Sequence, residues 1–158
     1  MPGFAHDSSI GRRDMLVVTG IGLVLTTAGL GLPRARADLA AMQARIDDLA
    51  AGRALQAGRI TLDLPEVAEN GATVPLAVEI ESPMTGDHHV KALYLFAERN
   101  PHPEIASFHF TPRSGRAMVA TRIRLAESQR VHALAEMSDG SLFTVAREVQ
   151  VTIGGCGG

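Results

Sequence analysis

Aromatic side chains are scarce in this sequence. It contains no tryptophan and one tyrosine, and aromatic residues make up 4% of the chain. Proteins that stack on nucleic-acid bases or on sugars rely on such rings. Aspartate and glutamate (17) slightly outnumber lysine and arginine (15), so the excess of basic residues typical of nucleic-acid binding is missing too. The composition therefore argues against a nucleic-acid partner.

Cysteine is almost absent as well. The one cysteine, Cys156, cannot form a disulfide within the chain. Glycine flanks it on both sides, at Gly154, Gly155, Gly157 and Gly158. Because glycine has no side chain to pack and few restrictions on φ, this segment can only present the thiol. Fully extended, it reaches about 15–20 Å beyond Ile153. Residues 154–158 are therefore predicted to be a flexible arm that brings a sulfur atom into another protein's active site.

The first 37 residues have the features of an export signal. Arg12 and Arg13, followed by Asp14, precede an apolar run over residues 15–32, and the small-residue site Ala35-Arg36-Ala37 comes after it. Paired arginines in this position are typical of twin-arginine signals. A retained membrane anchor is the competing interpretation, because the run could nearly span a bilayer. The cleavage site favours removal, so we expect a periplasmic mature protein that starts at Asp38 and has no stable membrane association.

Other roles for the thiol fit the sequence less well. A catalytic cysteine needs a base held in fixed geometry, and a glycine-flanked tail loses too much entropy to keep that geometry. The nearby terminal carboxylate also disfavours the reactive thiolate. A thiol oxidoreductase would need a second cysteine to resolve a mixed disulfide. The main alternative to the arm is a periplasmic binding or structural protein with an incidental thiol.

Residues 38–56 are predicted to form a helix. The apolar residues Leu39, Met42, Ile46 and Leu49 recur at steps of three and four, and alanines between them favour helix formation. Gly52 and Gly58 bracket the predicted end of this helix. The apolar stripe is narrow, so we expect it to pack on the chain's own domain.

From residue 59 onward, apolar and polar residues alternate, which is typical of strands. About seven strands are predicted, over residues 60–64, 74–80, 90–97, 105–111, 118–125, 131–137 and 142–153. Their number and spacing predict one all-β domain over residues 38–153, an immunoglobulin-like antiparallel β-sandwich with an N-terminal helix.

Two strands of this sandwich carry further information. Pro75 in the strand over residues 74–80 predicts an edge strand or a bulge, because proline donates no ladder hydrogen bond. The strand over residues 90–97 is apolar on both faces, which predicts a central position. With so few aromatic residues to fill a core, this second apolar face also predicts a partner subunit that adds burial.

The histidines do not suggest a metal centre. Outside the predicted signal they lie at His88, His89, His102, His109 and His132, with a spacing that matches no standard set of ligands. Solvated histidines are the default expectation for such a distribution. We therefore predict neither a metal nor another cofactor.

Several stretches of the chain resemble the SoxY family. They are the terminal GGCGG, residues 68–71 and 73–75, residues 82–85, residues 96–101, residues 121–126 and residues 137–140. SoxY is the carrier subunit of the bacterial Sox sulfur-oxidation system. The resemblance implies that Cys156 holds thiosulfate-derived sulfur covalently and that a SoxZ-like subunit pairs with the chain as a heterodimer. It also implies that periplasmic Sox enzymes process the bound sulfur, so that the chain itself is a substrate carrier and not an enzyme.

Overall fold

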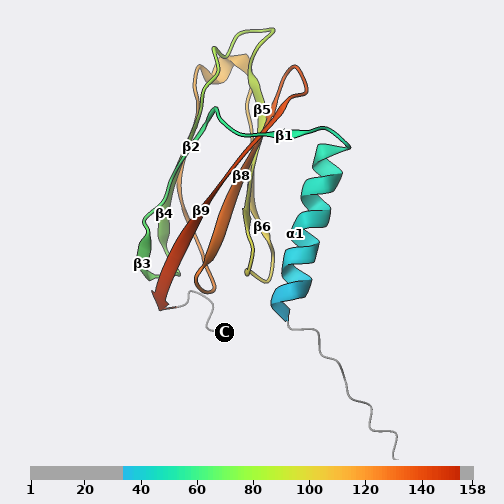
Figure 1. Cartoon of the computed structure of the whole chain (residues 1–158). Coiled ribbons are helices and arrows are strands. Elements are labelled where there is room, and N and C mark those ends of the chain that lie inside the picture. Colours follow the sequence, from blue (N-terminus) through green and yellow to red (C-terminus); the bar gives the residue numbers. More distant parts are fainter. Residues whose placement is uncertain (1–33, 154–158) are drawn as a thin grey trace, which may run out of the picture. The chain divides into compact units, whose positions relative to one another are not determined.

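The computed structural model describes residues 34–153, which form one α-helix, nine strands and a short 3-10 turn (Figure 1). Along the chain these are α1 (Arg34–Ala50), β1 (Leu55–Gln56), β2 (Ile60–Asp63), β3 (Val67–Asn70), β4 (Val74–Ile80), β5 (Val90–Ala97), β6 (Glu104–His109), η1 (Pro112–Ser114), β7 (Ala117–Ile123), β8 (Gln129–Met137) and β9 (Leu142–Ile153). All seven predicted strands are present, with ends within two residues of the predicted ones. The predicted all-β class with one N-terminal helix is confirmed.

The strands form two sheets. The larger has the order β1-β9-β8-β5-β6, with β3 paired to the far part of β9, and the smaller has the order β2-β4-β7. The seven predicted strands pair antiparallel, whereas β1 and β3 run parallel to β9. Neither β1 nor β3 was predicted, because both are short and mostly exposed and so lack an apolar alternation. The purely antiparallel prediction is therefore wrong at these two strands.

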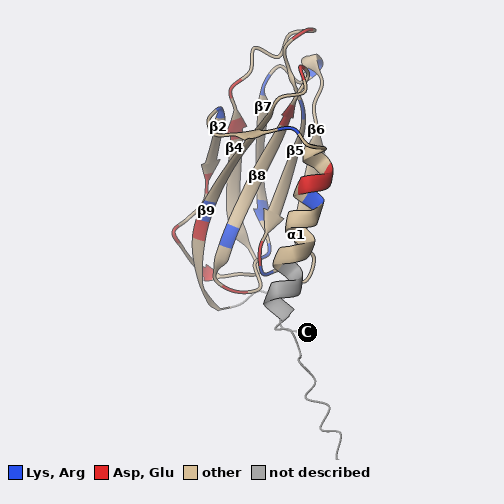
Figure 2. Cartoon of the chain, turned by 45° about the vertical axis from the view of Figure 1, so that its right-hand side comes forward, with Lys and Arg blue, Asp and Glu red and all other residues tan. Residues whose placement is uncertain are grey.

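The main core lies between the two sheets. Leu93 and Leu95 of β5 are fully buried there, together with Val78 of β4. Burial alternates along β4 with a period of two because successive side chains point to opposite faces of the sheet. Each fully buried leucine or valine stabilises the fold by about 1.5–3 kcal/mol. Acidic and basic residues are interspersed along the strands and loops of the described sandwich (Figure 2).

A second, smaller core lies between α1 and the outer face of the larger sheet. Met42 and Ile46 of α1 pack there with Phe96, Leu134 and Leu142. The expectation that the helix packs on its own domain is confirmed. Because β5 lies between β8 and β6 and is covered on its second face by α1, its central position is also confirmed. The same contacts remove the reason to expect a partner on that face, since the chain's own helix occupies it.

The helix differs from the prediction at both ends. It begins at Arg34, so the expected first residue of the mature chain, Asp38, lies inside it. It ends at Ala50 rather than at residue 56, because Ala51 (φ 47°) and Gly52 (φ 79°) turn the backbone into the left-handed region. No helix within residues 34–153 is long and apolar enough to cross a membrane.

The prediction for Pro75 is wrong for the strand as a whole. β4 is the central strand of the smaller sheet, and its pairing with β7 continues through Pro75 without a register shift. The proline is tolerated because β2 ends at Asp63, opposite Ala77. Pro75 therefore has no strand neighbour on the β2 side, where its missing N–H group would otherwise matter.

Candidate functional site

The residues predicted to carry the function lie outside the described part of the chain. This holds for Cys156 and the four glycines around it, and for Arg12 and Arg13 of the predicted signal. What the structure describes is the base of the predicted arm, which is the end of β9 at Ile153. We call the end of the sandwich that carries Ile153 and the β5–β6 and β7–β8 loops the arm end (Figure 1).

On one side, β3 holds the last residues of β9. Val67, Ala68 and Asn70 pair in parallel with Gln150, Val151 and Ile153. Just beyond β3, the N–H of Gly71 donates a hydrogen bond of 2.8 Å to the Ile153 carbonyl. The last described residue before the glycines is thus tied to the sheet by its own backbone, although its side chain is exposed.

On the other side, β8 begins only at Gln129, opposite Val149, so the rest of β9 has no β8 residue beside it. Ser128, the residue before β8, supplies the hydrogen-bond partner for this part of β9. The N–H of Val151 donates to Ser128 Oγ at 2.8 Å, and the hydroxyl lies 3.4 Å from the Val151 carbonyl. The end of β9 is therefore held from both sides.

The turn after β3 links this strand end to the β7–β8 loop. The Asn70 side-chain oxygen accepts a hydrogen bond of 2.8 Å from the N–H of Ala72, which closes the turn. The Gly71 carbonyl accepts a hydrogen bond of 2.8 Å from the N–H of Leu125. Gly71 therefore connects Ile153 to Leu125 through one peptide segment.

Two buried amides, Asn100 and Gln129, join the loops at the arm end. They are the two buried polar side chains among residues 39–153, at 6% and 4% exposure. Asn100 Oδ1 accepts hydrogen bonds from the N–H of Ala126 (3.0 Å) and from Gln129 Nε2 (2.9 Å). Asn100 Nδ2 donates to the Arg124 carbonyl at 2.8 Å, and Gln129 Oε1 accepts from the N–H of Arg99 at 2.7 Å.

Sequence reasoning did not single out these amides. Asn100 and Gln129 are 29 positions apart, and neither is distinguishable by residue type from an exposed loop amide. The only available signal was that Asn100 belongs to one of the stretches that resemble the SoxY family. Because all four polar atoms of the two amides have partners, the network fixes the loops without leaving an unsatisfied buried group.

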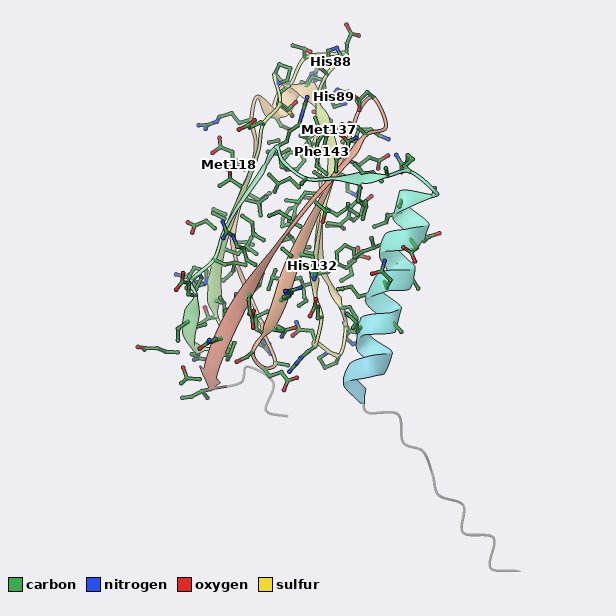
Figure 3. The ribbon with its side chains drawn as sticks, viewed as in Figure 1. His88, His89, Met118, His132, Met137 and Phe143 are labelled. Carbon is green, nitrogen blue, oxygen red and sulfur yellow. The ribbon has the colours of Figure 1, made fainter. Side chains whose placement is uncertain are left out.

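The histidines are spread over the domain. His88 and His89 lie at the end opposite Ile153, and His132 lies well away from them (Figure 3). His132 Nε2 is 2.8 Å from the Glu98 carboxylate, so the default of a solvated histidine is wrong for this residue. His109 contacts the Tyr94 ring edge to face. Within residues 34–153, no group of three or more histidine, cysteine, aspartate or glutamate side chains is placed to hold a metal ion.

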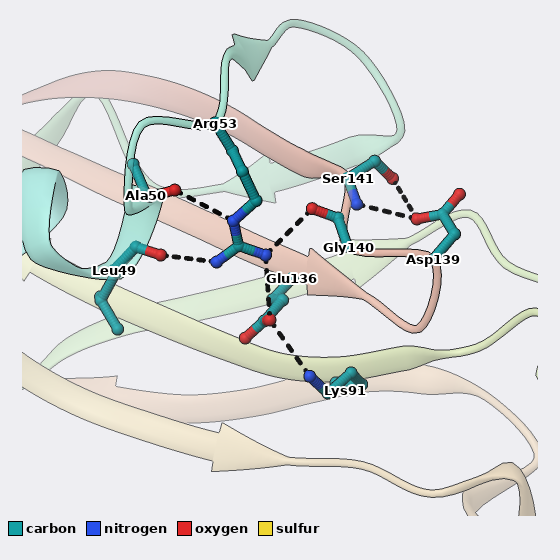
Figure 4. A network of polar contacts seen from close by, with 8 residues as sticks. All are labelled: Leu49, Ala50, Arg53, Lys91, Glu136, Asp139, Gly140 and Ser141. Atoms are coloured by element: carbon teal, nitrogen blue, oxygen red, sulfur yellow. Dashed lines mark hydrogen bonds and ion pairs between the residues drawn. The ribbon is translucent and has the colours of Figure 1, made fainter.

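Charged groups hold the opposite end, which we call the hairpin end because it carries the β8–β9 turn (Figure 4). Arg53 donates to the carbonyls of Leu49 (2.7 Å) and Ala50 (3.0 Å) at the end of α1, and to the Gly140 carbonyl (3.0 Å) in the turn. Arg53 and Lys91 both contact the Glu136 carboxylate, at 3.2 and 3.1 Å. The helix is thereby tied to the hairpin.

These contacts shift the pKa of two carboxyl groups at the hairpin end. Burial alone would raise the pKa of Glu136, but the hydrogen bonds from Lys91 and Arg53 outweigh it and the pKa is lowered. The pKa of Asp139 is lowered by hydrogen bonds from the hydroxyl and the N–H of Ser141. Both groups therefore favour the charged form.

Comparisons with known proteins connect this geometry to a family. The sequence model of a family described as sulfur oxidation protein SoxY matches residues 46–156. The solved structure of the sulfur carrier protein SoxY from Chlorobium limicola f thiosulfatophilum is 33% identical, with a TM-score of 0.55, over 70% of this chain and 99% of that chain. No match was found among curated proteins.

Two superoxide reductases share the fold alone. The neelaredoxin from Ignicoccus hospitalis is 18% identical, with a TM-score of 0.52, over 60% of this chain and 80% of that chain. The enzyme from Nanoarchaeum equitans is 12% identical, with a TM-score of 0.52, over 61% of this chain and all of that chain. At these identities the likeness carries no information about activity.

Proposed function

The chain belongs to the SoxY family, whose members include a sulfur carrier protein, and on that premise we propose that it carries thiosulfate-derived sulfur covalently on Cys156. The observation that supports this most is the position of the only thiol, which follows an anchored strand end by three residues and lies within the matched range 46–156. Residues 154–158 then act as an arm that presents the bound sulfur to sulfur-oxidising enzymes.

The anchoring of β9 supports a division of labour between domain and arm. Gly71 and Ser128 bind the last residues of β9 from opposite sides, so the starting point of the arm is fixed. The reach of the thiol is then set by the few residues after Ile153. In this proposal the enzymes supply the catalytic groups, and the chain needs no cofactor besides the sulfur adduct.

Export and assembly complete the proposal. Residues 1–37, with Arg12 and Arg13, act as a twin-arginine signal, and residues 38–158 work in the periplasm. The chain forms a heterodimer with a SoxZ-like subunit, an expectation that rests on family membership. The Sox enzymes of the periplasm bind the arm in turn.

The carrier role is tested by intact mass of protein purified from thiosulfate-grown cells. The wild-type chain is expected to carry sulfur adducts, and Cys156→Ser is expected to carry none, because serine lacks the nucleophile. A matched control is Met118→Cys in the Cys156→Ser background, which restores one thiol on an exposed side chain of the sandwich instead of the arm. We expect this thiol to stay unloaded.

Two outcomes would contradict the carrier role. Adducts on Cys156→Ser would show that sulfur is held elsewhere. Equal loading of the Met118→Cys control would show that any exposed thiol is modified and that the arm has no special role, as in a binding or structural protein with an incidental thiol.

A further inference from the structure

The last four residues of β9, residues 150–153, are held less firmly than the rest of the strand, where it ends beside β3 (Figure 1). Val149 is the last residue of β9 whose side chain is fully buried, and it pairs with Gln129, the first residue of β8. Beyond it, one side chain is partly buried, that of Val151, and the other three are exposed. Residues 150–153 therefore contribute little to the hydrophobic core.

Hydrogen bonds at the surface hold this segment in place. On the β3 side, the N–H of Gln150 donates to the Glu66 carbonyl at 2.9 Å, and the Ile153 carbonyl accepts from the turn after β3 at 2.8 Å. On the other side, the N–H of Val151 donates to Ser128 Oγ at 2.8 Å. When exposed bonds of this kind open, water replaces the lost partner and the freed backbone regains entropy. The two gains offset much of the loss.

The opening has a limit at Val149. This residue is 0% exposed, and its partner Gln129 belongs to the buried amide network with Asn100. Releasing Val149 would expose an apolar side chain and disturb that network, whereas releasing residues 150–153 does neither. Segments with few buried contacts open locally at a lower free energy than the whole fold. Residues 150–153 thus form a unit that can open while the sandwich stays folded.

Release of this segment changes where Cys156 can go. With Ile153 in place, the Cα of Cys156 stays within about 10 Å of Ile153, because it lies three residues further along the chain. With Val149 as the last fixed residue, it lies seven residues further, and the radius rises to about 24 Å. Reach straight ahead is unchanged, since the strand is already extended in that direction. The gain is sideways and backwards, along the flanks of the sandwich.

We propose that residues 150–153 are a second, releasable part of the arm, with a hinge after Val149 and with Ser128 as one of the groups that hold it closed. The inference rests on the proposed function, in which Cys156 carries the sulfur adduct. It adds that the carrier has two states. The closed state presents the thiol in line with β9, and the open state presents it to an enzyme bound at the side of the sandwich. An enzyme that binds the open state more tightly shifts the population toward it.

The test is a disulfide that the closed state cannot form. In Ala146→Cys the new thiol lies on an exposed residue of β9, about 24 Å before Ile153 along the strand. A disulfide joins Cα atoms at most about 7 Å apart, so Cys156 reaches position 146 from the open state but not from the closed one. Oxidised glutathione is the oxidant: the two protein thiols form one disulfide, and one oxidised glutathione is reduced to two glutathione thiols. Intact mass and peptide mapping without reductant follow the rate.

We expect this disulfide to form in the folded protein, at a rate independent of protein concentration. The rate should respond little to urea below the unfolding transition, because release of four residues exposes little surface. Adding Ser128→Ala should accelerate it about fivefold, the effect of losing one exposed hydrogen bond. Ser141→Ala at the hairpin end is the matched control and should leave the rate unchanged.

A second pair of thiols supplies the reference. Glu69→Cys replaces Ala146→Cys and places the new thiol next to Asn70, the partner of Ile153, where the closed arm already reaches it. Its disulfide with Cys156 should form readily and should not respond to Ser128→Ala.

Three results would count against the hinge. A disulfide at position 69 but none at position 146 would show that the segment does not open. A rate at position 146 that rises steeply with urea would show that the bond forms only through global unfolding. A rate unchanged by Ser128→Ala would overturn the role given to Ser128. Because the test involves no sulfur loading, these results leave the carrier role to the test with Cys156→Ser.

Discussion

The two ends of the sandwich are held together by different chemistry. At the arm end, Asn100 and Gln129 form a buried network of neutral amides. At the hairpin end, Arg53 and Lys91 meet Glu136 in partly exposed ion pairs. Neutral buried hydrogen bonds do not titrate and are hardly screened by salt, whereas exposed ion pairs are weakened by salt and by acid. The end that anchors the arm should therefore keep its structure over a wider range of pH and salt concentration than the hairpin end.

The largest expected effect comes from the arm end. Asn100→Leu removes the partners of the Ala126 N–H and of the Arg124 carbonyl, and one of the two acceptors of Gln129 Nε2. Because buried groups without partners cost about 1–3 kcal/mol each and some regain water, we expect a loss of about 3 kcal/mol in the free energy of unfolding, measured with urea.

The matched control for this variant is Asn70→Leu. Asn70 is also an amide at the arm end, at the last position of β3, but it is exposed and its side chain makes one hydrogen bond, accepted from the N–H of Ala72. We expect a loss below about 1 kcal/mol. Equal losses in the two variants would mean that burial of the amide network does not stabilise the arm end.

A smaller effect is expected at the hairpin end. Arg53→Met keeps the length of the aliphatic stem but removes the donors to Leu49, Ala50 and Gly140 and the contact with Glu136. Since these contacts are partly exposed, we expect a loss of about 1–2 kcal/mol in urea unfolding. Amide exchange at the end of α1 should also accelerate. A loss no larger than that of Arg113→Met, an exposed arginine without these contacts, would contradict the role given to Arg53.

How far the sequence predicts the molecule depends on the range of the contacts involved. The strand over residues 90–97 is predictable because its apolar residues lie next to one another. By contrast, β1 and β3 form because short segments from elsewhere in the chain pair with the long strand β9, β1 at its start and β3 at its end. No local pattern encodes such a pairing.

The residues of the candidate site also differ in how well the sequence predicts them. Cys156 stands out in the sequence because it is the only cysteine and glycines surround it. The anchor beneath it does not, since Ser128 and Gly71 act through contacts with residues 23 or more positions away. The residue that carries the chemistry of the arm can thus be identified from the sequence, whereas the residues that support the arm can be identified only from the structure.

A third variant tests the anchor locally. Ser128→Ala removes the acceptor of the Val151 N–H at an exposed position, so the free energy of unfolding should fall by less than about 1 kcal/mol. Hydrogen exchange of the Val151 amide should nevertheless accelerate clearly, because this N–H then opens to water without global unfolding. The control is Ser141→Ala at the hairpin end, which should leave Val151 unchanged. An unaltered Val151 exchange rate in Ser128→Ala would mean that β3 alone holds the strand end.

The smallest effect concerns pH and separates the two ends most directly. The pKa of Glu136 is lowered in the folded protein, so the unfolded chain binds its proton more readily. The stability that this group contributes is fully present above its ordinary pKa of about 4.5 and is lost as the pH falls through the lower folded value. The difference in unfolding free energy between wild type and Glu136→Gln should therefore shrink in acid.

The control is Asn100→Leu, whose loss of unfolding free energy should stay constant over the same pH range, because amides do not titrate. A constant difference for Glu136→Gln would show that Arg53 and Lys91 do not stabilise its charge, and an acid-dependent deficit for Asn100→Leu would show that the amide network is coupled to charged groups after all.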